Sequence, residues 1–156
     1  MGAIEGGRPK IEIANEAACL AAELLTSRDQ LAVISVDTMA APVLPLSKVE
    51  EPEDIKRRIR TMRPGGGGIF CFTALRAAYD TLLSPESDSQ VRHVILLSDA
   101  ADTNQQEGCL ELAKASLDQH GITTTVVALG RAQDTPFLQA LANAGGGRFY
   151  EAMKME

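Results

Sequence analysis

The chain is poor in aromatic residues, since its 156 residues include no tryptophan, two tyrosines and four phenylalanines. Its core must therefore be built from alanine, valine, isoleucine and leucine. Apolar residues make up 45% of the chain and charged residues 23%, a composition that argues against disorder, collagen and coiled coil. The length is typical of one domain, so we expect a single domain over residues 1–156.

Long hydrophobic runs are also missing. No apolar run approaches the ~20 residues that a membrane span needs, so we expect no membrane segment in this chain. Residues 1–10 lack the apolar stretch of a signal peptide. The formal net charge is -6, and this acidic balance argues against a broad nucleic-acid footprint. We therefore expect no nucleic-acid partner.

Cysteine is scarce and its spacing is uninformative. Cys19, Cys71 and Cys109 are odd in number and form no C-x-x-C, which excludes a disulfide framework and a zinc spacing and predicts reduced thiols. There is no G-x-S-x-G motif. Cys71, His93 and Asp99 could be combined into a catalytic Cys–His–Asp arrangement. However, His93 falls in the first half of its strand, away from the carboxyl end. We predict no catalytic residues and no enzyme.

Short apolar runs alternate with helical patterns along the chain. This alternation indicates a parallel sheet with helices on both faces. The run at 31–36 is almost entirely apolar, so we expect it to be covered on both faces. The chain begins with a helix of the buried type, and no strand is predicted before it. We expect helices at 10–25, 53–62, 73–83, 107–119 and 135–143, and strands at 31–36, 41–46, 91–97, 122–129 and 148–151.

Ligands of such sheets gather at the loops beyond the carboxyl ends of the strands. Asp99 ends the clearest strand, and Asp102 and Asp134 are expected to be solvated loop residues. The residues that we expect on the binding face are Asp37, Gly67, Gly68, Thr73 and Asp102.

Five segments, in their order along the chain, resemble a von Willebrand factor A domain of the bacterial type. The resemblance runs from about residue 10 to residue 150 and implies an α/β fold with a doubly wound, mostly parallel sheet and helices on both faces. It also implies a non-enzymatic module that contacts a protein partner. The segments are Asp29–Asp37, Gly65–Tyr79, His93–Ala100, Gly121–Gly130 and Gly145–Tyr150.

The resemblance also implies a metal-ion-dependent adhesion site built from D-x-S-x-S, a threonine after glycines and an aspartate at a strand end. This sequence has no D-x-S-x-S, and Ile69 or Gly68 stands where the threonine should be, with Thr73 close by. Asp99 matches, although Ala100 replaces the usual glycine. One carboxylate holds Mg²⁺ poorly. We predict an absent or vestigial site and no cofactor, with Mg²⁺ or Mn²⁺ bound only if another segment completes it.

In the family the first strand is central, and this chain lacks its counterpart. Strands 31–36 and 92–97 would then flank a slot with unpaired backbone groups, which are costly when buried. The alternatives are direct pairing of these strands, a strand donated by another chain as in a strand-donating dimer, or a fragment truncated relative to the family. Met1 stands where the methionine after D-x-S-x-S would lie, so our hypothesis is that the natural domain extends upstream.

A second function class is nucleotide or phosphate binding by the Gly65–Gly68 loop. Glycines before a helix can hold phosphate through backbone N–H groups. The chain lacks G-x-x-x-x-G-K-[ST], and Phe70 occupies the last glycine's place in G-x-G-x-x-G. These glycines also follow a predicted helix rather than a strand. Phosphate binding is therefore kept as the alternative to a protein-interaction module.

Overall fold

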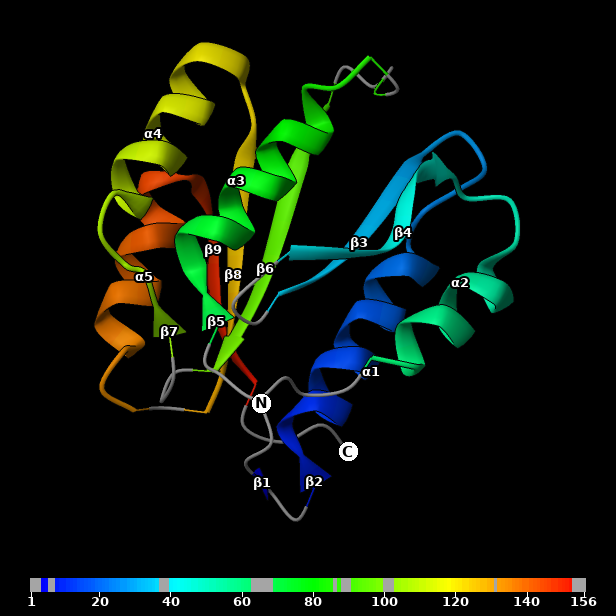
Figure 1. Cartoon of the computed structure of the whole chain (residues 1–156), viewed down its shortest axis with the longest axis horizontal. Helices are drawn as coiled ribbons and strands as arrows, with labels where there is room; N and C mark the ends of the chain where they lie inside the picture. Colours follow the sequence, from blue (N-terminus) through cyan, green and yellow to red (C-terminus); the bar gives the residue numbers. More distant parts are fainter. Residues whose placement is uncertain are drawn as a thin grey trace.

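The computed structural model describes residues 4–5, 8–36, 40–62, 69–85, 87, 91–99, 103–130 and 132–152. Strands and helices alternate along the chain (Figure 1), which confirms the predicted α/β class. The elements are β1 (Ile4–Glu5), β2 (Arg8–Pro9), α1 (Lys10–Glu23), β3 (Gln30–Val36), β4 (Ala40–Lys48), α2 (Pro52–Arg60), β5 (Ile69–Phe70), α3 (Cys71–Leu82), β6 (His93–Asp99), β7 (Thr103–Asn104), α4 (Cys109–His120), β8 (Thr123–Leu129), α5 (Thr135–Ala144) and β9 (Gly146–Ala152).

Strands β6, β8 and β9 form a parallel sheet in that order. Helices α4 and α5 make the crossovers between them, as parallel pairing requires. Alternate residues of β6 and β8, such as Val94, Leu96 and Val126, pack into one core with α3, α4 and α5. On the opposite face, Leu97 and Leu129 meet the start of α1. The expected helices on both faces are therefore present.

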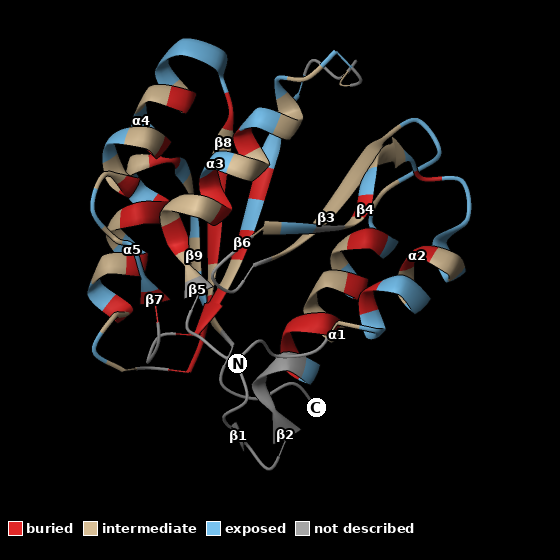
Figure 2. Cartoon of the chain, in the orientation of Figure 1, coloured by how far each residue is buried: buried red, intermediate tan, exposed pale blue. Residues whose placement is uncertain are grey.

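The N-terminal part is an antiparallel hairpin of β3 and β4 packed against α1 and α2. Its core is smaller and includes Cys19, Leu44, Ile55 and Ile59. Figure 2 shows the contrast, with buried residues concentrated in the half that contains β8 and with much of β3 and β4 only half-buried. The hairpin register is irregular between Leu31 and Ile34. The predicted short strand at 41–46 is confirmed as part of β4.

The described strands do not form one continuous sheet. Strand β3 pairs with β4 alone and β6 pairs with β8 alone, so the direct pairing of 31–36 with 92–97 is not found. The expectation that both faces of 31–36 are covered is wrong, because residues 31–35 are half-buried. A strand with a neighbour at only one edge keeps part of its surface in water. A single domain over residues 1–156 stays a prediction.

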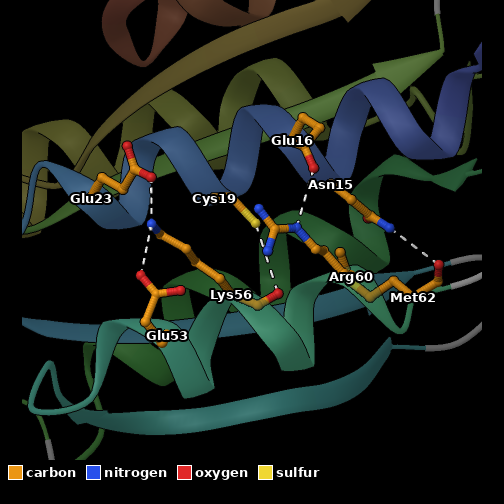
Figure 3. A network of polar contacts seen from close by, with 8 residues as sticks. All are labelled: Asn15, Glu16, Cys19, Glu23, Glu53, Lys56, Arg60 and Met62. Carbon is orange, nitrogen blue, oxygen red and sulfur yellow. Dashed lines mark hydrogen bonds and ion pairs between the residues drawn. The ribbon is translucent and has the colours of Figure 1, made fainter.

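Ion pairs join α1 to α2, as Figure 3 shows. Lys56 on α2 binds Glu23 on α1, and the hydrogen bond to Glu23 raises the pKa of Lys56. Nearby, Arg60 Nε donates to Glu16 Oε1 at 3.3 Å. These ion pairs add to the apolar contact between α1 and α2. Across the described ranges, no helix is both long and apolar enough to cross a membrane.

Candidate functional site

Polar side chains gather at the carboxyl ends of β6 and β8, where the fold class predicts a binding edge. Asp99 ends β6 and is 3% exposed. Its backbone oxygen accepts a hydrogen bond from Thr103 Oγ1 at 2.7 Å. The Thr103 hydroxyl also lies 2.8 Å from Ser98 Oγ, and all three residues are buried. Asp99 therefore belongs to a packed polar cluster rather than to an open loop.

Asp134 ties the loop before α5 to the segment after β6. Its Oδ2 accepts the Thr103 backbone N–H at 3.0 Å, and its Oδ1 accepts from Gln106 Nε2 at 2.8 Å. Asp134 stands at the N-cap of α5 but makes no side-chain bond to that helix. The expectation that Asp134 is only a solvated loop residue is therefore wrong, because its carboxylate bridges two loops.

A second link joins the start of α3 to the segment before α4. Gln105 Oε1 accepts from the Thr73 backbone N–H at 2.9 Å and from Thr73 Oγ1 at 2.8 Å. The N-cap residue of α3, Phe70, offers no side-chain hydrogen bond, so Gln105 serves as a cap from a distant segment. Helix α3 accordingly starts at Cys71 instead of the predicted residue 73.

The backbone of Gln105 is itself unusual. Its φ is +57°, the left-handed region that a glutamine rarely adopts. Such a conformation costs on the order of 1–3 kcal/mol and persists only where surrounding contacts hold it. The two bonds to Thr73 are such contacts. We call the Thr73–Gln105 and Thr103–Asp134–Gln106 bonds the edge links.

The structure brings the predicted loops together in part. Strand β5 pairs in parallel with β7, with Ile69 opposite Thr103, and this pair sets the segment of Thr73 beside the segment that follows Asp99. Within the described ranges, no group of three or more His, Cys, Asp or Glu side chains could hold a metal. The weak metal assignment of Asp99 is untested and stays a prediction. Asp37, Gly67, Gly68 and Asp102 lie outside the described residues, as does the whole Gly65–Gly68 loop.

The structure also places the residues of the rejected catalytic arrangement. His93 is the first residue of β6 and Asp99 the last, so the two lie at opposite ends of one strand. The ring of His93 is hydrogen-bonded to Thr123 Oγ1, and burial lowers the pKa of His93. Cys71 is fully buried, at 0% exposure. This geometry does not assemble a Cys–His–Asp constellation.

Comparison with known protein families shows to which family this fold belongs. A family profile described as von Willebrand factor type A domain matches residues 4–151 of the chain. The chain belongs to the von Willebrand factor type A family. The resemblance inferred from the sequence is thereby confirmed. A search of the curated proteins finds no match.

Solved structures show the same type A fold at low identity. The conserved hypothetical protein BatB from Bacteroides thetaiotaomicron has a TM-score of 0.76 at 17% identity, covering 94% of this chain and 82% of BatB. An aerotolerance-related membrane protein from Bacteroides fragilis has a TM-score of 0.73 at 16% identity, covering 92% and 81%. Proximal thread matrix protein 1 from the mussel byssus, with a zinc-occupied MIDAS motif, has a TM-score of 0.72 at 20% identity, covering 91% and 38%.

Sequence reasoning missed the residues that organise this edge of the type A domain. Gln105 and Asp134 act on partners 32 and 31 residues away, Thr73 and Thr103. No local sequence pattern predicts these long-range hydrogen bonds, because a glutamine in the left-handed region has no sequence signature.

Proposed function

We propose that this type A domain is a non-enzymatic protein-interaction module that contacts its partner through the loops at the carboxyl ends of β6, β7 and β8. We further propose that this contact needs no metal ion. The observation that carries the proposal is the set of edge links. In them, Thr73, Thr103 and Asp134 are engaged with groups of the chain itself.

Preorganisation is the physical basis of the proposal. A loop that is already fixed loses less conformational entropy when a partner binds. A bridging cation can fix loops by drawing oxygen ligands together. Here, the neutral amide of Gln105 and the carboxylate of Asp134 join the same loops by hydrogen bonds of 2.8–3.0 Å. The byssus protein is the contrasting case, because zinc occupies its metal-ion-dependent adhesion site (MIDAS).

Thermal unfolding with chelator and then with excess Mg²⁺ or Mn²⁺ tests the metal-independent part. We expect the midpoint to stay within about 1 °C, because no cation is needed to complete the edge. A cation at ~100 Kd would stabilise the fold by about 2.7 kcal/mol. For a chain of this size that is roughly 5–11 °C. A rise of that size that is lost in Asp99→Asn would contradict the proposal.

Affinity capture with matched variants tests the contact face. Glu107 lies before α4 at the proposed edge, and Asp118 lies in the last turns of α4 at the far end. Both are exposed acids, so Glu107→Lys and Asp118→Lys make the same charge change at opposite ends of one helix. We expect a protein captured from the source cells to be lost with Glu107→Lys and kept with Asp118→Lys. Equal capture by both variants would place the contact elsewhere.

The edges of the strands support a second mode of contact, separate from the loops. Among the described strands, β3 and β6 each pair with one neighbour, and an added strand can extend a sheet at such an edge. We propose that a second copy of the chain donates that strand. Sedimentation velocity should then show a dimer whose fraction rises with concentration, whereas a monomer at all concentrations would contradict this mode of contact.

A further inference from the structure

One face of the β6–β8–β9 sheet is covered at only one end. Successive residues of a strand point to opposite faces, so His93, Ile95 and Leu97 of β6 face away from the core shared with α3, α4 and α5. Leu97 packs against the cluster of Ile13 and Leu129 at the start of α1. His93 and Ile95 are exposed, as the pale blue segments of β6 in Figure 2 show. The amino-terminal half of this face is therefore open, although parallel sheets are ordinarily buried on both faces.

Strand β9 extends this open face. Leu97 pairs with Val127 and Val127 pairs with Tyr150, so Tyr150 lies on the same face as Leu97. Arg148 precedes Tyr150 by two positions and shares that face, and its backbone N–H donates to Thr125 Oγ1 at 3.2 Å. Arg148 is exposed, and none of the ion pairs found between described residues involves its guanidinium. We call the exposed residues His93, Ile95, Arg148 and Tyr150 the open sheet face.

Helix α1 carries an apolar stripe that begins beside this face. Leu20 and Leu24 follow Ile13 by about two and about three helical turns, so all three lie on one side of α1. Ile13 is buried against the sheet, but Leu20 is 51% and Leu24 84% exposed. We call these three residues the α1 stripe. Four of the six exposed large apolar side chains in the described part of the chain belong to the stripe or to the open sheet face. Such a concentration of exposed apolar surface is typical of an interaction site.

The two parts of this surface carry opposite charge. The open sheet face has the positive guanidinium of Arg148. Beside the α1 stripe, Lys56 binds both Glu23 and Glu53, so two carboxylates share one ammonium and one net negative charge remains. A stripe from one copy of the chain and a sheet face from another are therefore complementary in charge as well as apolar. Two sheet faces placed together would instead bring arginine against arginine.

We propose that two copies of the chain associate, with the α1 stripe of each copy packed on the open sheet face of the other. Stripe and face adjoin at Ile13, so a single two-fold axis makes both contacts at once. The exposed leucines of the stripe then cover Ile95 and Tyr150, and Glu23 lies near Arg148. This contact goes beyond the proposed loop contact and needs no donated strand.

Sedimentation velocity of the full chain with matched leucine variants tests the apolar part. Leu20→Ser changes the stripe, and Leu83→Ser makes the same change at the C-cap of α3, where the leucine is 41% exposed. Both leucines are exposed, so both variants should stay folded, which their unfolding curves check. We expect the dimer of Leu83→Ser to match the wild type and that of Leu20→Ser to be at least ten-fold weaker. Equal dissociation constants would overturn this contact and leave strand donation standing, whereas a monomer at all concentrations contradicts both.

The salt dependence of the dimer tests the charge pairing. The wild-type dimer should weaken several-fold between ~0.1 M and ~1 M salt, because salt screens the attraction between Glu23 and Arg148. Arg148→Gln should be weaker than the wild type at low salt and should change little as salt rises. Arg76→Gln, which removes an exposed arginine of α3, is the control and should follow the wild type. An Arg148→Gln dimer with the wild-type affinity and salt dependence would overturn the pairing with Glu23.

Discussion

Strands β3 and β8 are both short and rich in branched apolar residues, yet they have different surroundings. β8 lies between β6 and β9, and Val126, Ala128 and Leu129 are 0% exposed. β3 pairs only with β4, and residues 31–35 are half-buried. Composition alone would have assigned the two strands to the same environment. The number of neighbouring strands, which is a property of the whole fold, decides how much of a strand is buried.

The same difference extends to the two regions that contain these strands. The region around β8 has a large apolar core whose members include Leu75, Leu138 and Leu141 at 0% exposure. The region around β3 has a smaller core, and ion pairs join its two helices across a partly wet surface (Figure 3). Packing dominates the first region and charge contributes to the second. The two should therefore respond differently to a cavity, to salt and to acid.

Equivalent cavities in the two cores should give the largest difference. Leu141→Ala removes a fully buried side chain from the β8 core, where rigid packing limits collapse, and should cost about 3–5 kcal/mol of unfolding free energy. Leu44→Ala makes the same change in the β3 core at a residue that is 7% exposed, and should cost about 2 kcal/mol. Urea unfolding of both variants measures the two losses.

The measurement also shows whether the regions unfold together. If the chain unfolds in two states, both variants should move the single midpoint and leave the slope unchanged. Equal losses for the two leucines would mean that the β3 core is packed as rigidly as the β8 core. A larger loss for Leu44→Ala would reverse the comparison.

Most elements could be predicted because their signals are local. Pro52 opens α2 and Gly121 ends α4 in the left-handed conformation, so both boundaries follow from backbone chemistry. The apolar run of β6 likewise predicted its position. The short pair β5 and β7 could not be predicted, because two-residue strands have no periodicity and depend on a distant partner.

The candidate site was predictable only in its location. Asp99 was expected at the end of a strand, and the structure places it there. The bonds that organise the edge join Thr73 to Gln105 and Thr103 to Asp134, residues that only the folded chain brings together. A sequence pattern predicts well the helix or strand to which a residue belongs. It does not report which side chain of another element will satisfy a helix terminus.

Salt should affect the β3 region more than the β8 region. The Lys56 side chain is 12% exposed. Lys56→Met keeps its packed aliphatic part but removes the ion pair with Glu23 on α1. Arg76→Met removes an exposed pair with Asp80 on α3 and serves as the control. We expect Lys56→Met to lower the unfolding midpoint by a few degrees at low salt and by less at ~1 M salt, where the Debye length falls to about 3 Å and salt weakens this partly exposed ion pair. Arg76→Met should change little at either concentration, and equal effects of both variants would remove the distinction.

Acid should produce the smallest effect, and it should act on the β8 region through His93. This residue begins β6, its ring is hydrogen-bonded to Thr123 Oγ1 at the start of β8, and burial lowers its pKa below the ordinary 6.5. The unfolded chain then takes up a proton more readily than the folded chain. This contribution to stability is complete above pH 6.5 and is lost as the pH falls through the lower folded value. The unfolding midpoint of the wild type should thus fall more steeply between pH 7 and pH 5 than that of His93→Gln, whereas parallel curves would show that the ring titrates alike in both states.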